Sequence, residues 1–573
     1  MPIVRKYNIP ALFCALAVLL CALSARPYAD MAVCDDGPYI LMARTLANTG
    51  HIVYNGWGAP MLGWQLYLAA AFIKLFGFSF TAVRMSTVLV SVALAFVLQR
   101  TLVAAGITER NASIGTLALV LSPFYLILSV TFMSDITGLF GIVICVYGCL
   151  RALQASSDRA TIGWIAFAVL TNAIFGSSRQ ISWLGILVMV PSTLWLLRSR
   201  RCVLLSGAAL TLAGALFIVA CMQWLKHQPY SLPEHLLPSL FPVALFFRRL
   251  INYLLDIPFL LLPILALFLN HIRKRPIRAA AISLVVIFLA ACADHHYLGH
   301  GLEPISSDFV DKFGVVFEPG NKGSPPIFLP QSISVLLTLI SLGGVVGLMT
   351  SFLSPHKTSR PAAPPAIPSG KELGIVLAPF AIAYSLLLLP RVAMYGISDR
   401  SLLALLVVEV IFLVRYYQDH TDNHLPLAGI VMVGAMAIYA IICTRNTFAF
   451  YRARVAFAAE LRSAGIPDTS VDNGWEYNML TELQHADHIN VYGISLPANA
   501  YVRPPAPPAA TCPMFLYDET PHIHPLYGVS FDPNACYGLA PFPPVHYSRW
   551  PRRTPGTLYA VRYTPSSKPL HHP

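Results

Sequence analysis

The sequence is poor in charged residues. Only 12% of its 573 residues are Asp, Glu, Lys or Arg, whereas soluble domains carry about 25%. A chain with so little charge cannot surround a water-soluble core with a polar shell. Its hydrophobic fraction of 56% and mean hydropathy of +0.63 also exclude a disordered chain and a coiled coil. The apolar residues form long unbroken runs rather than alternating, so we expect an all-α polytopic membrane protein and not an outer-membrane barrel.

The sequence also lacks any Cys/His spacing typical of zinc, and we expect neither metal nor cofactor. It shows no internal repeat either. Lys and Arg exceed Asp and Glu by 39 to 27, but the basic residues gather at the ends of apolar runs. That distribution follows the positive-inside rule and does not indicate nucleic-acid binding. Most cysteines lie in apolar runs. Cys512 and Cys536 lie in a polar tail instead, where a disulfide outside the cytoplasm is expected and two free thiols are the alternative.

A membrane span needs about 20 apolar residues. The sequence predicts 13 spans, at residues 9–25, 84–105, 112–132, 136–153, 161–178, 181–197, 203–224, 252–270, 278–293, 330–353, 373–390, 401–416 and 425–443. Basic residues at 5–6, 198–201, 273–278 and 357–360 place the N-terminus in the cytoplasm of a plasma (inner) membrane. An odd number of spans then places the C-terminus on the periplasmic, extracytoplasmic side. A cleaved signal peptide is the alternative for the first span.

These spans divide the chain into a transmembrane domain, residues 1–444, and a C-terminal region, residues 445–573. Two long loops, 26–83 and 294–329, fall on the same outer side as the tail. For the tail we expect a small irregular α/β structure. Because the two long loops and the tail all lie on the outer side of the membrane, we expect the protein to act on that side.

Two adjacent acids, Asp35 and Asp36, follow the first span in a chain where acids are scarce. Pro38 is tolerated in the first turn of a helix, and an acid before it suits the positive helix end. A helix that begins here places Asp36, Tyr39 and Ala43 on one face. The alternative to a functional acidic pair is a solvated helix cap.

A third acid, Asp135, stands at a short outer turn before the span at 136–153. An acid at the edge of a span is costly unless it is paired or functional, and a helix cap is again the alternative. Several arginines also lie at outer span ends, against the positive-inside trend: Arg179, Arg248, Arg249, Arg391 and Arg400. Because the guanidinium group binds phosphate with a fixed fork of donors, these residues predict a site for a phosphate-bearing substrate. Structural ion pairs and snorkelling are the alternatives.

Taken in order, these features resemble the GT-C glycosyltransferases, in particular the bacterial branch related to protein O-mannosyltransferases and aminoarabinose transferases. The resemblance rests on Asp35-Asp36-x-x-Tyr39, Arg84, Ser134-Asp135, Arg179, Asp399-Arg400 and a short tail stretch at 472–478. It implies a bundle of about 13 transmembrane helices with a periplasmic first loop. It also implies transfer of one sugar from a polyprenyl-phosphate carrier, a lipid-linked donor in the bilayer, to a glycolipid, a cell-envelope glycan or a protein.

The resemblance implies that Asp35 is the catalytic aspartate, and we expect its carboxylate to act as a general base in an inverting transfer. The expected catalytic residues are Asp35, Asp36 and Asp135. The expected substrate-binding residues are Tyr39, Arg179, Arg391 and Arg400. A divalent ion bound by the three acids and a histidine is the alternative to metal-free chemistry.

One departure concerns the donor sugar. A Lys-Pro-Pro-Leu stretch of the aminoarabinose transferases corresponds to residues 58–61, which lack the lysine, so aminoarabinose cannot be assumed. A lipid-linked-glycan ligase or polymerase and a transporter or flippase are the rival functions, and a non-catalytic scaffold is a third. A transporter would place charges near mid-membrane and show repeated halves.

Overall fold

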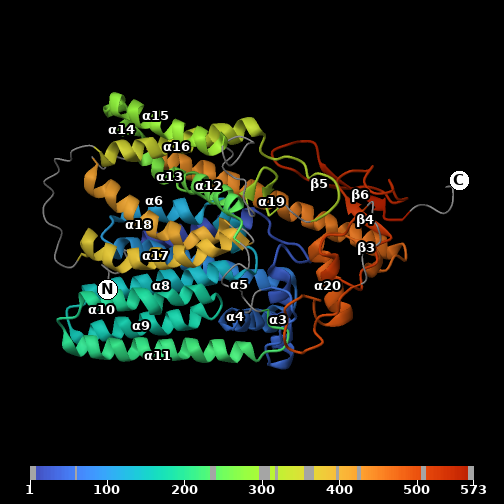
Figure 1. Cartoon of the computed structure of the whole chain (residues 1–573), viewed down its shortest axis with the longest axis horizontal. Helices are drawn as coiled ribbons and strands as arrows, with labels where there is room; N and C mark the ends of the chain where they lie inside the picture. Colours follow the sequence, from blue (N-terminus) through green and yellow to red (C-terminus); the bar gives the residue numbers. More distant parts are fainter. Residues whose placement is uncertain are drawn as a thin grey trace.

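The computed structural model describes residues 8–58, 61–232, 241–295, 310–316, 320–353, 367–394, 399–421, 427–504 and 512–564. Several predicted features lie wholly or partly outside this part of the chain: the basic residues at 5–6 and 357–360, residues 59–60, and residues 296–309 and 317–319 of the loop at 294–329. The described chain is mainly helical. Its long helices form a bundle, and α3, α4, α20 and the strands gather at one end of that bundle, on the right of Figure 1.

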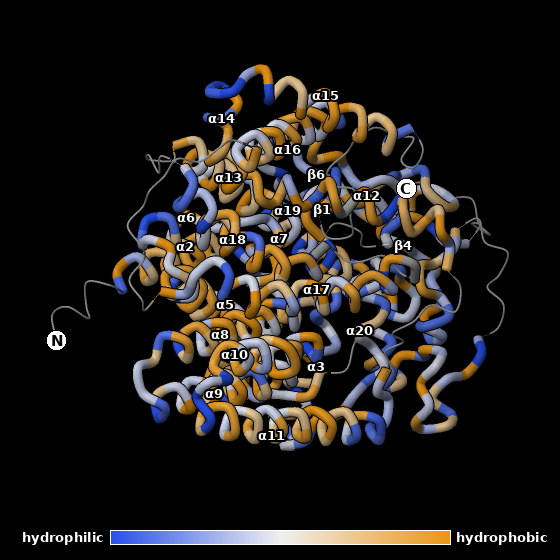
Figure 2. The backbone as a smooth tube through the Cα atoms, turned by 60° about the vertical axis from the view of Figure 1, so that its left-hand side comes forward, coloured by the Kyte–Doolittle hydropathy of each residue, from blue (hydrophilic) through white to orange (hydrophobic). Residues whose placement is uncertain are grey.

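Nine of the described helices are long and apolar enough to cross a membrane. They are α5 (Phe80–Ala104), α8 (Ser134–Gln154), α9 (Asp158–Gly176), α11 (Arg201–Lys226), α15 (Pro276–Ala293), α16 (Gln331–Phe352), α17 (Gly370–Met394), α18 (Leu403–His420) and α19 (Leu427–Ser463). Hydrophobic residues run along most of these helices, and hydrophilic residues concentrate in the connecting segments (Figure 2). This arrangement is typical of a multi-pass membrane protein.

Two bent helix pairs are also apolar enough to cross a membrane, and the described chain has up to 11 candidate spans if each pair counts as one span. The first joins α6 (Glu109–Val120) to α7 (Pro123–Ser129) at 70°, because Pro123 starts a new helix there. The second joins α12 (Val243–Leu260) to the stretch Leu262–Lys274 at 58°. That stretch contains α13 (Leu262–Leu265), the 3₁₀ turn Ala266–Phe268 and α14 (Leu269–Lys274).

Two of the predicted spans coincide with shorter apolar helices, and the count of 13 therefore stays a prediction. One is α2 (Ile9–Ser24). The other is Gln180–Leu196, which passes from a 3₁₀ turn (Gln180–Trp183) through a π-helical turn (Gly185–Met189) to α10 (Val190–Leu196).

Helix α11 separates the basic segment 198–201 from the first loop and the tail, which lie at its opposite ends. Just beyond its C-terminal end, the backbone of Tyr230 bonds to Gly56 of the first loop and to Leu496 of the tail. The basic segment 198–201 lies at its other end, about 39 Å away for 26 residues of helix. The tail and the first loop therefore share the end of the bundle opposite to this basic segment.

The tail begins without a break in the last helix. Helix α19 crosses the predicted boundary at residue 444 and leads to α20 (Trp475–Ala486). A four-stranded sheet follows in the order β3-β4-β6-β5, formed by Val471–Asp472, Tyr527–Ser530, Gly556–Arg562 and Val545–Tyr547. β3 runs parallel to β4, and the other pairs are antiparallel. The predicted disulfide is present, since Cys512 is bonded to Cys536. A hairpin from the loop at 294–329, β1 (Val310–Asp311) and β2 (Gly314–Val315), packs on α19 through a bond from Thr447 to the Val315 carbonyl.

Candidate active site

The acidic pair starts helix α3 (Asp36–Thr49), as predicted. Asp35 is its N-cap residue, and the helix ends at Gly50, whose φ of 77° suits a residue without a Cβ. Asp36, Tyr39 and Ala43, which the spacing places on one face of the helix, are all buried. The two neighbouring acids nevertheless point into very different surroundings.

Asp36 lies in a sealed ion pair with Arg84 of α5. Its carboxylate accepts bonds from Arg84 Nε at 2.7 Å and Nη2 at 3.2 Å, and also from the backbone N–H groups of Val33 and Phe132. Both side chains are fully buried. Arg84 gives its other donors to the carbonyl oxygens of residues 29 and 31. The prediction that Asp36 is catalytic does not fit this environment, because its oxygens are occupied and no substrate atom can reach them.

Asp35 belongs instead to a half-open chain of alternating charges, which we call the Asp/Arg chain. It consists of Asp35, Arg400, Asp135 and Arg179. Arg400 lies 3.3 Å from Asp35 through Nη2 and 3.8 Å from Asp135 through Nη1. Arg179 Nη1 lies 2.6 Å from the other oxygen of Asp135. The side chains of Asp35 and Arg179 are 36% and 24% exposed. Four residues that are far apart in the sequence thus meet, with Asp35 and the two arginines partly exposed and Asp135 buried between the arginines.

Asp135 and Arg179 are positioned by α8 and by the turn after α9. Asp135 stands in the first turn of α8, but the N-cap residue of that helix is Met133, so the helix-cap interpretation of Asp135 is wrong. Its carboxylate instead faces Arg179. Arg179 crosses α8 at Gly138, where a Cβ would lie 2.7 Å from the Cβ of Arg179. Only a glycine lets the arginine side chain come this close to the helix.

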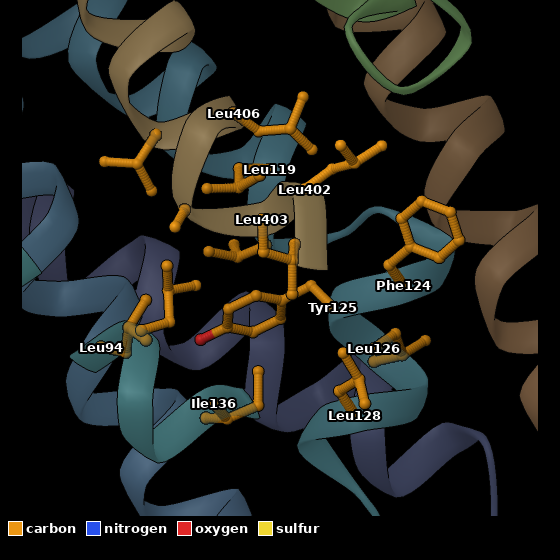
Figure 3. Packing of buried hydrophobic residues seen from close by; sticks show 14 of the residues in the cluster. Leu94, Leu119, Phe124, Tyr125, Leu126, Leu128, Ile136, Leu402, Leu403 and Leu406 are labelled. Carbon is orange, nitrogen blue, oxygen red and sulfur yellow. The ribbon is translucent and has the colours of Figure 1, made fainter. Parts of the chain in front are cut away.

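Arg400 is positioned by the packing of its neighbours. It lies in the 3₁₀ turn Asp399–Leu402, directly before α18. Figure 3 shows Leu402 and Leu403 beside Tyr125 of α7, with Ile136 of α8 below the same ring. All four side chains belong to the main hydrophobic core. This packing brings the turn that carries Arg400 to the start of α8, where Asp135 lies.

A narrow cavity opens onto the Asp/Arg chain. Its lining includes Asp135, Gly138, Arg179, Ser182, Tyr384 and Arg400. Tyr384 of α17 donates its hydroxyl hydrogen to the carbonyl of Ser401 at 2.8 Å. Sequence reasoning missed Tyr384 and Gly138. Nothing in the sequence distinguishes that tyrosine or glycine from others in long apolar runs.

The two remaining predicted residues lie beside this site. Tyr39 is 5% exposed and lies against Gly58, and burial raises the pKa of its hydroxyl. The Asp35 carboxylate raises this pKa further, whereas Arg400 and Arg179 lower it, so Tyr39 stays a neutral hydrogen-bond donor. Arg391 lies on α17 seven residues beyond Tyr384, and so on the same helix face about 10 Å further along.

The structure also tests whether the acids form a metal site. In the described part of the chain no three His, Cys, Asp or Glu side chains gather as metal ligands would. Asp36 is bound to Arg84, and Asp35 and Asp135 both face arginines. The alternative of a divalent ion held by the three acids and a histidine is therefore not formed by the described residues.

Comparisons with known proteins give structural matches only, since no family model and no curated protein matches the chain. ArnT from Cupriavidus metallidurans in the apo state is 14% identical, covers 82% of this chain and 84% of its own, and has a TM-score of 0.41. The same protein bound to undecaprenyl phosphate covers 83% and 84%, with a TM-score of 0.40.

A third match is the S. cerevisiae protein O-mannosyltransferase Pmt1-Pmt2 complex bound to the sugar donor. It is 14% identical and has a TM-score of 0.31, and the match covers 38% of this chain and 32% of that one.

Proposed function

We propose that the protein is an inverting membrane glycosyltransferase that moves a sugar from a polyprenyl-phosphate carrier to an acceptor at the end of the bundle that bears α3 and the tail. The observation that carries the proposal is the Asp/Arg chain. It places a half-exposed carboxylate beside two arginines where apolar helices end. A lipid-linked sugar phosphate needs these parts: lipid-facing helices for the chain, cations for the phosphate, and a base for the acceptor.

In the proposed reaction Asp35 accepts the proton of an acceptor hydroxyl as its oxygen attacks the anomeric carbon of the donor sugar. The new carbon–oxygen bond forms opposite the bond to the phosphate, which breaks, so the configuration inverts. The electron pair of that bond leaves with the polyprenyl phosphate, whose negative charge increases. Arg400 and Arg179 stabilise this developing charge, and Arg391 adds a further cation.

The pairing in the Asp/Arg chain explains how the site keeps charged groups ready without a substrate. Arg400 contacts both acids, at 3.3 and 3.8 Å, which are long for ion pairs. A donor phosphate competes for Arg400 and frees the Asp35 carboxylate to act as the base. Arg179 keeps its short contact to Asp135, so Asp135 orients an arginine and does not itself transfer protons.

The remaining roles follow from burial. Asp36 is a positioning residue, since its bonds to Arg84 fix the first turn of α3. Tyr39 donates a hydrogen bond to the sugar or the phosphate. We also propose a plasma-membrane location with the N-terminus in the cytoplasm and the tail in the periplasm. The basic segment at the far end of α11 and the disulfide in the tail support this orientation.

The test is a transfer assay with purified protein, synthetic polyprenyl-phosphate sugars, and envelope lipids and proteins as acceptors. Mass spectrometry follows both released polyprenyl phosphate and glycosylated product. Asp35→Asn is expected to lower the transfer rate about 10²- to 10⁴-fold, because the base is lost while the side-chain shape is kept.

Asp158→Asn is the matched control, because Asp158 pairs with Arg200 and is 50% exposed, at the basic end of the bundle. Its rate should stay within about twofold of the parent rate, as for other exposed pairs. A folded Asp35→Asn variant that transfers at the parent rate would refute the assignment of the base.

A further inference from the structure

A second hydrophobic cluster joins the tail to the catalytic turn, apart from the main core of the bundle. It contains side chains of α3, of the loop that follows it, of α4 (Trp64–Phe76) and of α20. Tyr39 and Trp57 from the first loop lie in the same cluster as Met479 and Leu483 from the tail. Residues more than 400 positions apart thus pack around the helix that begins at Asp35.

Trp57 is the side chain of this cluster that reaches the catalytic turn. It is 7% exposed, and its ring lies on Gly37, the second residue of α3. A Cβ on Gly37 would meet ring atoms of Trp57 at 2.6 and 2.9 Å, so the ring lies against the backbone itself. Asn55 adds a bond to the Pro38 carbonyl at 3.4 Å. The loop therefore supports the first turn of α3 two residues from Asp35.

The tail in turn supports Trp57. Trp475, the first residue of α20, meets the Trp57 ring edge to face, with centroids 5.9 Å apart and planes at 78°. The backbone N–H of Ile489 donates to the Asn55 carbonyl at 2.8 Å. Gly56 lies so close to the Ile489 carbonyl that a Cβ there would be 2.9 Å from its oxygen. The tail thus holds the loop through a ring contact and a backbone bond.

A buried ion pair fixes α20, and with it Trp475, to the last helix of the bundle. Glu476 lies 3.0 Å from Arg454 of α19, with the side chains 1% and 0% exposed. Tyr451 donates its hydroxyl hydrogen to the other oxygen of Glu476. Because breaking a buried pair is costly, this pair holds the start of α20, and with it Trp475, in place against α19.

We propose that Trp475 and Trp57 are positioning residues for Asp35, through which the tail sets the geometry of the catalytic turn. The consequence for the rate rests on the proposed function. The Asp36–Arg84 pair and the ring of Trp57 both hold the first turn of α3, so the position of Asp35 depends on both contacts. A displacement of about 1 Å at a reacting group can cost about 10²-fold in rate.

The kinetic test compares tryptophan variants in the purified full chain. Trp475→Ala is expected to lower kcat about tenfold and to change the KM for the lipid donor by less than about twofold, since the phosphate-binding arginines are untouched. Trp475→Phe keeps an aromatic ring on Trp57 and should recover most of the rate. Trp550→Ala is the matched control, because Trp550 lies in the same tail but contacts Arg445 of α19.

A second readout does not depend on activity. Cys34 precedes Asp35, and Cys202 is exposed at the opposite end of the bundle, at the start of α11. Alkylation of each thiol by a small maleimide can be followed by peptide mass spectrometry. Trp475→Ala should raise the rate at Cys34 about threefold or more and leave Cys202 unchanged, because local opening exposes the turn.

The two readouts separate the possible failures. If the parent transfers no sugar but Cys34 responds to Trp475→Ala, the proposed function fails and the positioning role stands. If Trp475→Ala behaves like Trp550→Ala at Cys34 and in kcat, the positioning role is overturned. Should Trp475→Ala not fold, Trp57→Phe tests the same contact, since the smaller ring withdraws from Gly37, and parent-like values in both readouts would again overturn the role.

Discussion

Asp35 and Asp36 are adjacent, and both face an arginine, yet their surroundings differ completely. The Asp36–Arg84 pair has no exposed surface, and backbone groups take up the rest of its bonding capacity. The Asp35–Arg400 contact is longer, is partly exposed, and borders a cavity. The same two residue types thus fix a turn in one place and stay available to a ligand in the other. Burial and the number of competing bonds, not residue type, decide which role an ion pair takes.

Arg84→Met breaks the sealed pair and should have the largest effect. The Asp36 carboxylate is left buried without its cation, which costs about 3–5 kcal/mol of folding free energy. We expect a strong loss of folded protein, measured as the monodisperse fraction and the thermal midpoint in detergent. Arg200→Met, which breaks an exposed pair, is the control and should stay close to the parent. A parent-like midpoint for Arg84→Met would show that the pair does not hold the turn.

Arg400→Ala breaks the Asp/Arg chain and should act on function more than on stability. It removes charged hydrogen bonds to a donor phosphate, each worth about 1.5–3 kcal/mol, or about tenfold to hundredfold in affinity. Binding of polyprenyl phosphate, measured by native mass spectrometry or calorimetry, should weaken by that factor while the thermal midpoint changes little. Arg400→Lys keeps the charge without the fork and should give an intermediate value. Unchanged lipid binding in Arg400→Ala would remove Arg400 from the phosphate site.

Gly138→Ala leaves every charge in place and tests the geometry of the Asp/Arg chain alone. The new Cβ would lie 2.7 Å from the Cβ of Arg179, so the arginine must shift. We expect the transfer rate to fall about fivefold with little loss of stability, a small effect because guanidinium groups can partly reorient. Gly163→Ala on α9 is the control, since a Cβ there meets nothing within 4 Å. Equal rates for the two variants would show that the position of Arg179 does not matter.

The sequence was most informative where charge is scarce. Asp35, Asp135, Arg179 and Arg400 could be singled out because charged residues at outer span ends are costly, and the structure brings these four together. The helix beginning at the acidic pair was predictable from Pro38 and the spacing of its buried face. These features depend on composition and on neighbouring residues, so they can be recognised without knowing the fold.

The rest depended on contacts between distant segments. The sequence presents Asp35 and Asp36 as equivalent, and only the position of Arg84 on α5 separates their roles. Tyr384 and the pair Trp57–Trp475 are ordinary aromatic residues until the bundle and the tail bring them to the site. The bends at the α6–α7 and α12–α13 junctions were also not predicted, because straight and bent helices can have equally apolar sequences.

The most direct test measures stability and transfer rate per folded molecule side by side for Asp35→Asn and Arg84→Met. We expect Asp35→Asn to keep the thermal midpoint of the parent and to lose transfer of sugar from polyprenyl phosphate. We expect Arg84→Met to lose folded protein, while any folded fraction retains measurable transfer. A stable Asp35→Asn protein that transfers sugar at the parent rate would contradict the account, because no base would then be needed at the open end of the Asp/Arg chain.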